Sequence, residues 1–177
     1  MRWSAPKDRV LPHDDRSSWR THGLPAAKDH TKTPAPPPLE IETKRRVIRR
    51  AIIRELNLGE TSWRRVPTPV GEVTVRRKAA GYIAGKKGRG QYANRILPTL
   101  TDPDEVWQVA FDDGTFRNRY IKLYDDPGTG GSLCIVSKLP DGQEVFINYI
   151  PMNDLPEDDA DARIDVQRAG SLLFRRG

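Results

Sequence analysis

The sequence predicts an α+β fold in which N-terminal helices pack on a four-stranded antiparallel sheet, preceded by a disordered Pro-rich arm. Three observations support this prediction. Seven of the fifteen prolines lie in residues 1–40, helical periodicity begins after Glu40, and four β-rich runs separated by short turns follow residue 104. Consecutive runs joined by short turns are typical of an antiparallel meander, and the preceding helices would cover one of its faces.

The first segment, residues 1–40, contains Pro34-Ala-Pro-Pro-Pro38 and all three histidines, His13, His22 and His30. Its apolar residues follow neither a 3.6-residue nor a 2-residue period. This composition predicts a disordered arm that ends in a stiff polyproline spacer. Residues 41–177 are then expected to form one basic domain.

Helical spacing is clearest over residues 43–56, where the apolar side chains fall on one face and five arginines on the opposite face. The sequence leaves open whether this helix binds RNA or a partner, or simply packs with a solvated basic face. Residues 66–71 read as a proline-rich connector and residues 72–75 as a short strand. Two short helices are expected over residues 78–87 and 91–100.

The four predicted strands span residues 105–111, 116–124, 132–139 and 143–150, and two of the turns between them contain Asp-Gly. An acidic run over residues 154–165 reads as a solvated loop. The tail at residues 168–177 is expected to add a short closing strand or helix.

Charge is unevenly distributed along the chain. Residues 41–124 carry 18 Lys and Arg against 9 Asp and Glu, whereas residues 125–166 carry 2 against 10. A basic body favours a polyanionic partner such as nucleic acid, because neutralised phosphates release counterions, although a solubilising surface has the same composition. The acidic segment could also fold back over the basic groove as a phosphate mimic, and this remains a third interpretation.

Several classes of function are disfavoured. No run of about 18 apolar residues exists, so no membrane partner is expected. The N-terminus has no apolar signal region and Cys134 is the single cysteine, which together favour a cytoplasmic protein without disulfides. The predicted domain has no histidine and one cysteine, so we expect no metal and no cofactor.

The remaining candidates are cationic and aromatic. A glycine-rich turn brings backbone close to any bound phosphate, and successive residues of a strand point to alternate faces. Candidate catalytic residues are Lys86, Lys87, Arg95, Tyr82, Tyr92 and Lys122. Candidate substrate-binding residues are Arg89, Arg117, Arg119, Tyr120 and Asn148. A strand face with Tyr120, Lys122 and Tyr124 could stack bases, or could be an ordinary amphipathic strand.

The arrangement of a short strand at Pro69–Val75, a short helix, and then Leu100-Thr-Asp-Pro-Asp-Glu-Val106 leading into a meander resembles a phage nuclease family. That family groups domains akin to barnase, EndoU, the tRNA-cutting colicins and RelE, and the resemblance covers residues 66–177. It implies helices packed on a four-stranded antiparallel sheet. It also implies RNA as substrate and, for toxic members, an immunity protein, with phage head components or the virion as further associations.

The activity implied by the resemblance is metal-independent RNA cleavage. A base takes the 2′-hydroxyl proton, the oxygen attacks the adjacent phosphate, cations stabilise the phosphate oxygens, and an acid protonates the leaving group. Many relatives are expected to carry a histidine near the position of Tyr82, and none lies there. The alternatives are the histidine-free arrangement of the RelE-like branch, or a non-catalytic nucleic-acid-binding or virion-associated module.

Overall fold

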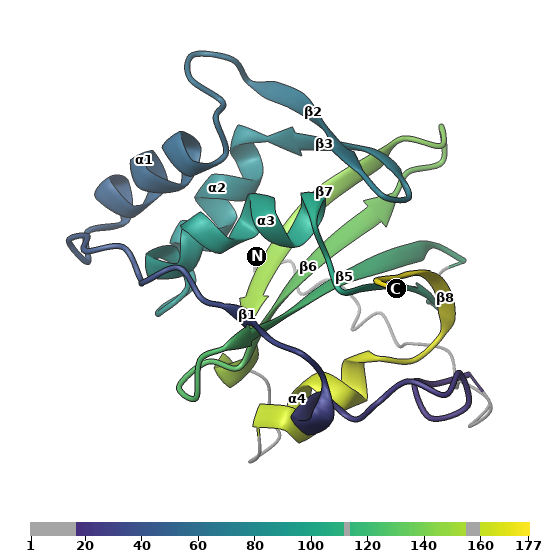
Figure 1. The fold of residues 1–177 in the computed structure, drawn as a ribbon. Helices are drawn as coiled ribbons and strands as arrows, with labels where there is room; N and C mark the ends of the chain where they lie inside the picture. Colours follow the sequence, from purple (N-terminus) through teal and green to yellow (C-terminus); the bar gives the residue numbers. More distant parts are fainter. Residues whose placement is uncertain (1–16, 112–113, 155–159) are drawn as a thin grey trace, which may run out of the picture.

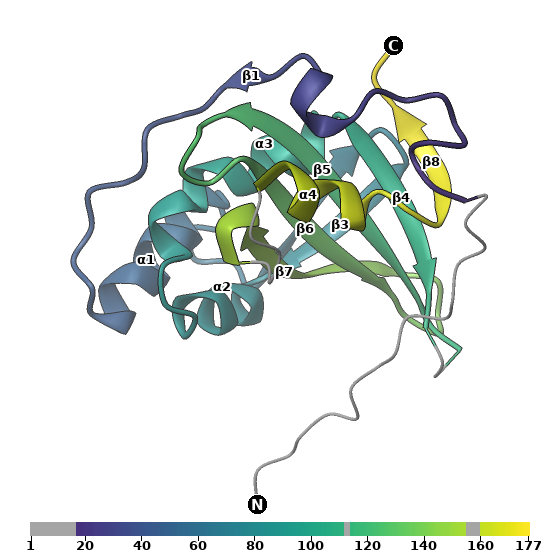
Figure 2. The same cartoon turned by 90° about the horizontal axis from the view of Figure 1, so that it is seen from below.

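The computed structural model describes residues 17–111, 114–154 and 160–177. It is a mixed α+β structure in which helices lie on both sides of one curled sheet (Figures 1 and 2). The helices are α1 (Arg45–Glu55), α2 (Arg77–Ala84), α3 (Ile96–Thr101) and α4 (Ala160–Gln167), with shorter 3₁₀ segments η1 (Ala27–Asp29), η2 (Gly90–Arg95) and η3 (Met152–Asp154). Within the described ranges, no helix is long and apolar enough to cross a membrane.

The sheet has eight strands, and seven of them follow the order β2-β3-β7-β6-β5-β4-β8, while β1 pairs with β5. The pairings β3–β7 and β1–β5 are parallel, and the others are antiparallel. The strands are β1 (Thr33–Pro34), β2 (Trp63–Thr68), β3 (Gly71–Arg76), β4 (Glu105–Ala110), β5 (Phe116–Asp125), β6 (Gly131–Lys138), β7 (Glu144–Pro151) and β8 (Ser171–Arg175).

The predicted four-stranded antiparallel sheet was therefore wrong. The four expected runs are present as the neighbouring strands β4 to β7, but they form only the middle of a larger, mixed sheet. The helices are also not all N-terminal, because α4 follows the meander. Short turns predict which strands are consecutive neighbours. They give no information about strands that join the sheet from distant parts of the chain, as β3 and β8 do.

The first half of the connector expected at residues 66–71 is the end of strand β2, which pairs with β3 as an antiparallel hairpin, and Pro69 and Val70 form the turn between them. The connector's two prolines, Pro67 and Pro69, suggested a turn. Proline lacks the N–H that a central strand must donate, but an edge strand has one side that needs no partner. Because β2 is the first strand of the sheet, it accommodates Pro67 within the strand itself.

Residues 17–40 do not form the disordered arm that was expected, and residues 1–16 lie outside the described part of the chain. Thr33 and Pro34 pair with Tyr124 and Asp125 of β5. Ala27 is fully buried in the core. This segment runs along the outside of the domain and ends near α1 (Figure 2). Contacts with distant residues order it despite a composition that favours no regular element.

Two hydrophobic cores lie on opposite faces of the sheet, as the alternation of side chains along a strand requires. On β5, Tyr120 joins the core beneath α1, α2 and α3, whereas Ile121 and Leu123 join a second core with Ile164 of α4. The second core is smaller and covers only part of its face. Part of that face is therefore left open, which matters for the site described below.

A buried ion pair joins the C-terminal segment to the sheet. Arg168 Nη2 donates to Glu105 Oε1 at 2.6 Å and its Nε donates to Glu105 Oε2 at 2.8 Å, with both side chains buried. Asp165 accepts from Arg168 Nη1 and from the backbone N–H of Ala27. These bonds tie α4 and the segment before β1 to strand β4. Part of the stretch read as an acidic loop is thus helical, while residues 155–159 of that run lie outside the described residues.

Replacement of Arg168 by methionine is expected to lower the free energy of unfolding by about 3–5 kcal/mol, because it leaves the Glu105 carboxylate buried without a counter-charge. Urea denaturation followed by far-UV circular dichroism measures this change. The control is Arg175→Met at an exposed position on β8, which is expected to change stability by less than about 0.5 kcal/mol. Equal stabilities of the two variants would contradict the role given to this ion pair.

Candidate functional site

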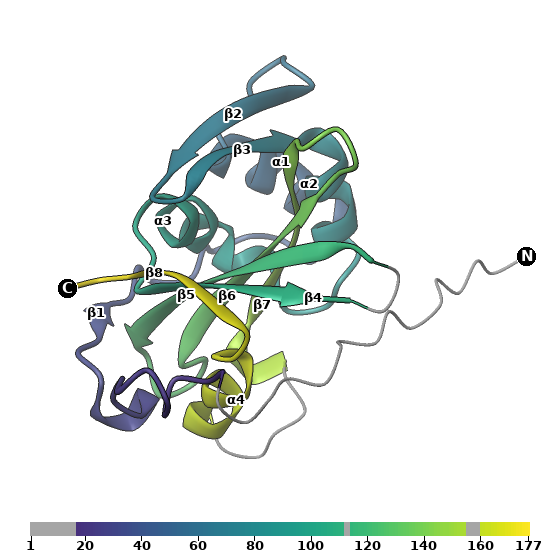
Figure 3. The same ribbon diagram turned by 90° about the vertical axis from the view of Figure 1, so that its right-hand side faces the viewer.

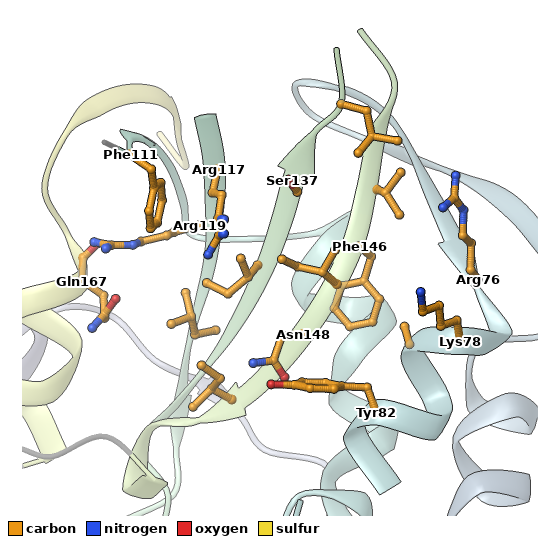
Figure 4. A pocket seen from close by; sticks show the side chains of 17 residues that line it. Arg76, Lys78, Tyr82, Phe111, Arg117, Arg119, Ser137, Phe146, Asn148 and Gln167 are labelled. Atoms are coloured by element: carbon orange, nitrogen blue, oxygen red, sulfur yellow. The ribbon is translucent and has the colours of Figure 1, made fainter. Parts of the chain in front are cut away.

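A cleft of about 650 Å³ opens on the sheet face that the second core leaves uncovered. Its floor is formed by aliphatic side chains of β6 and β7, together with Phe146. One wall carries Phe111, Arg117, Arg119 and Gln167, and the opposite wall carries Arg76, Lys78 and Tyr82 (Figure 4). All of the charged side chains among its described lining residues are cationic. The cleft thus combines an apolar floor with positively charged walls.

The first wall arises from the alternation of β5. Arg117 and Arg119 point to the same face, as the sequence predicted, and the pairing register aligns Arg119 with Ile135 of β6 and then with Asn148 of β7. A row of three side chains thus crosses the cleft from one side to the other. Arg117 lies over the ring of Phe111, with its Cζ 4.2 Å from the ring centroid. That stacking orients its guanidinium along the wall.

Arg119 is in an unusual electrostatic position. Its Nη1 donates to the backbone carbonyl of Gln167 at 3.2 Å, and no carboxylate forms an ion pair with it among the described residues. Burial lowers the pKa of the Arg119 guanidinium to about 10. At neutral pH the group still carries its charge, but this charge has lost hydration without gaining an anionic partner. An anion in the cleft would supply the missing interaction.

Asn148 is held in a defined orientation by Arg89. Arg89 Nη1 donates to Asn148 Oδ1 at 3.0 Å and approaches the carbonyl oxygen of Tyr149 at 3.4 Å. Because the oxygen of the amide is engaged, its nitrogen is the atom presented toward the cleft, as Figure 4 shows. A bulge in the β6–β7 pairing between Ile135 and Val136 lets both Phe146 and Ile147 contact the cleft beside it.

The second wall comes from α2 and the end of β3. Tyr82 is 49% exposed and its ring lies beside Asn148 in the cleft (Figure 4). Lys86 places its ammonium 5.0 Å from the centre of the Tyr82 ring. The cleft therefore brings together Tyr82, Asn148, Arg117 and Arg119, while Lys86 contacts Tyr82 and Arg89 contacts Asn148 from outside the lining. Lys87 is exposed in the turn after α2 and does not line the cleft.

Arg95 and Tyr92 lie elsewhere. Arg95 is 1% exposed and donates to Thr129 Oγ1 at 2.9 Å, Pro36 O at 2.9 Å and Asp126 Oδ2 at 3.0 Å. Tyr92 is buried and stacks with Arg95, at 4.7 Å from the guanidinium carbon to the ring centroid. Arg95 thus fastens the segment around Pro36 and the β5–β6 turn to η2, and Tyr92 packs against its guanidinium. Their contacts are those of structural residues.

On the other face of β5, the candidate side chains are buried. Tyr120 is fully buried in the core under the helices, and burial raises its pKa to about 12. Lys122 is 3% exposed, and its Nζ donates to the backbone carbonyl of Asp102 at 2.6 Å and to Asp102 Oδ2 at 3.1 Å. The ordinary amphipathic-strand interpretation of this face is therefore the one that fits the structure.

Sequence reasoning missed Arg76, Lys78, Ser137, Gln167 and the aromatic residues Phe111 and Phe146. The basic triplet Arg76-Arg77-Lys78 at the junction of β3 and α2 was an available signal, because such a junction places side chains at a sheet edge. Gln167 carried no signal, since α4 was not expected.

Residues 155–159 of the acidic segment lie outside the described residues, so its folding over the cleft stays a prediction. Asp165, which is described, points instead to Arg168 and Ala27. In the part of the chain that the structure describes, no group of three or more His, Cys, Asp or Glu side chains gathers in a metal-binding arrangement.

The fold and the cleft define a basic α+β protein whose open sheet face combines an apolar floor with cationic walls. Comparison with known families makes this specific. Residues 51–175 match the family described as phage-Barnase-EndoU-ColicinE5/D-RelE like nuclease 2, and the chain belongs to this family. The resemblance found in the sequence is thereby confirmed, and nucleic acid is the substrate class that the family implies. No curated protein and no solved structure matches the chain.

Replacement of Arg119 by methionine is expected to raise the free energy of unfolding of the unliganded protein by about 1–3 kcal/mol. The folded-state pKa of about 10 lies below the unfolded value, so the charged form destabilises the fold at every pH below about 10. This penalty fades as the pH rises through that value. Urea denaturation at pH 7 measures the change. A loss of stability would show that Arg119 has a compensating partner and would contradict the electrostatic account of the cleft.

Proposed function

We propose that the protein is an endoribonuclease that binds a single strand of RNA in the cleft and cleaves it without a metal ion. Attack of a 2′-hydroxyl on the adjacent phosphate would form a 2′,3′-cyclic phosphate and release a 5′-hydroxyl. The observation that carries this proposal is the partly buried, carboxylate-free guanidinium of Arg119 at the wall of an apolar cleft. A ribose-phosphate strand has an anionic part that matches the guanidinium and a less polar part that matches the apolar cleft.

The scissile phosphate is assigned to the wall formed by Arg117 and Arg119. Negative charge builds on the phosphate oxygens in the transition state, and fixed cations in a poorly hydrated site stabilise that charge without reorganising. Arg119 is already desolvated and held by Gln167 O, so little rearrangement is needed when the charge develops. The cationic walls also support a metal-independent reaction, because they repel a divalent cation from the same space.

The base next to the scissile phosphate is assigned to the opposite wall. The half-exposed ring of Tyr82 offers a stacking surface, and base–aromatic stacking is a common source of affinity for single strands. The Asn148 amide nitrogen, oriented by Arg89, is a donor for an acceptor atom on the base edge. RNA held between the two walls would have its backbone at β5 and its base at α2.

Proton transfer is assigned to Tyr82. Among the described side chains that line the cleft, Tyr82 carries a phenolic hydroxyl, which can both donate and accept. The Tyr82 phenol lies beside Asn148 on the wall facing the arginines (Figure 4). From there the phenol can protonate the leaving 5′-oxygen, while solvent water takes the 2′-hydroxyl proton and then returns a proton to the phenolate.

Cleavage of an RNA oligonucleotide is expected in excess EDTA, with a 2′,3′-cyclic phosphate on the upstream product. A substrate with 2′-deoxyribose at the cut position is expected to remain intact, because it lacks the attacking oxygen. Arg119→Met should lower kcat/KM by about 10²–10³-fold, and Arg175→Gln is the matched control on the surface of β8. Gel analysis and mass spectrometry of the products measure both. Binding without cleavage, or cleavage only with added divalent metal, would contradict the proposal.

Tyr82→Phe is expected to lower kcat by about 10²-fold or more with little change in KM, since phenylalanine keeps the stacking ring and loses the proton. Tyr82→Ala should raise KM as well. Steady-state kinetics on the same oligonucleotide separates the two effects. A wild-type kcat for Tyr82→Phe would leave Tyr82 with a stacking role alone and would remove it as the acid.

A further inference from the structure

We propose that the arginine face of α1 extends the cleft into a track for the RNA backbone, so that the substrate is an RNA reaching from the cleft across α2 to α1. This inference rests on the proposed function and deepens it. The inference specifies a long RNA with many phosphates as the substrate, and not a dinucleotide that occupies only the cleft. The track is defined here as the arginine side chains of α1, namely Arg45, Arg46, Arg49, Arg50 and Arg54.

The first observation is the unbalanced charge of α1. All five arginines are exposed, and none of them forms an ion pair with a carboxylate within the described ranges. Arg45 and Arg49, Arg46 and Arg50, and Arg50 and Arg54 are each four residues apart, so like charges adjoin along one face. The first turn holds two of the arginines and no acidic residue, which opposes the helix dipole. A bound polyanion would remove each of these unfavourable interactions.

The second observation is the contact between this face and α2. Arg45 Nη2 donates to the backbone carbonyl of Gly81 at 3.1 Å. A Cβ at Gly85 would lie 3.3 Å from Arg45 Nη2, and a Cβ at Gly81 would lie 3.7 Å from Arg49 Nε. The glycines of α2 therefore let the first arginines of the track lie directly against its surface.

Helix α2 also forms the cleft wall, which makes it the bridge between the two sites. Lys78 and Tyr82 line the cleft, and Lys86 lies over the Tyr82 ring at the rim. Gly81 precedes Tyr82 and Gly85 precedes Lys86, so the residues contacted by Arg45 adjoin those that border the cleft. Figures 1 and 2 show α1 and α2 side by side. Cations thus lie on both walls of the cleft, at Lys86 beside Tyr82, and on the α1 face that contacts α2.

The dimensions favour a strand of RNA over a compact nucleotide. Crossing a helix with its side chains takes about 10 Å, and this distance spans about three phosphates of one strand in a duplex. Four of the five arginines also precede residue 51, where the family match begins. The track is therefore mostly an addition to the part of the chain that defines the family.

The test compares two ligands on the double variant Arg46→Gln/Arg50→Gln, which changes two exposed side chains and relieves like-charge repulsion. One ligand is an RNA of about 20 nucleotides, long enough to span the cleft and α2, made non-cleavable with 2′-deoxyribose for binding. The other is a cleavable dinucleotide monophosphate. Fluorescence anisotropy at several salt concentrations measures binding, and product analysis measures cleavage.

For the long RNA, the variant is expected to raise Kd by about tenfold. The slope of log K against the logarithm of the salt concentration should become smaller by about 1.4, which is about 0.7 for each phosphate that the variant no longer neutralises. Dinucleotide cleavage should be unchanged. Lys28→Gln/Arg175→Gln is the matched control, because it removes the same charge from η1 and β8, away from α1 (Figure 1). This control should bind the long RNA as the unmodified protein does.

Unchanged affinity and slope in the α1 variant would overturn the track, as would an equal loss in the control variant. A parallel loss of dinucleotide cleavage would also overturn it, since the effect would then reach the cleft itself. If the unmodified protein cleaves neither RNA, the proposed reaction fails, while the binding comparison still decides the track. The two failures are therefore distinguishable.

Discussion

The charge of Arg119 is the constraint around which the cleft is organised. This guanidinium has lost water and, among the described residues, gains only the carbonyl of Gln167, which raises the free energy of the unliganded fold. Such a cost persists in proteins mainly where the group has a use, because a neutral side chain of similar size would be more stable there. The apolar floor strengthens the effect, since it lowers the local dielectric around the charge. An anionic ligand with an apolar portion satisfies both features at once.

This arrangement depends on the C-terminal segment, which is remote from the meander in the sequence. The ion pair of Arg168 with Glu105 fixes the end of α4 against β4, and the adjacent Gln167 carbonyl is then in place to hold Arg119. On the other wall, Arg89 fixes the amide of Asn148. Gly170 allows the chain to leave α4 over β4, because a Cβ there would clash with the carbonyl oxygen of Gln108. The residues that position the cleft walls are thus residues that do not line the cleft themselves.

The sequence predicted the middle of the sheet, helix α1 and the division of β5 into two faces, because these follow from local periodicity. The sequence could not predict which face of β5 is open, since this depends on where helices α1 to α4 pack against the sheet. Tyr120 and Lys122, which were candidate site residues, are therefore found buried, whereas Arg117 and Arg119 line the open face. Arg95 was misread for a related reason. Its partners Pro36 and Asp126 are distant in sequence, and the first of them lay in a segment expected to be disordered.

The central claim is that nucleic acid occupies the open face of β5 and lies against Arg119. Side-chain NMR of the arginine guanidinium and asparagine amide groups, recorded while a 2′-deoxy-modified RNA strand is titrated into the protein, tests it most directly. The account predicts that the largest shifts occur at Arg119, Arg117 and Asn148, with Arg95 nearly unchanged. Shifts concentrated at Arg95 and around Lys122, with Arg119 unaffected, would place the ligand on the opposite face and contradict the account.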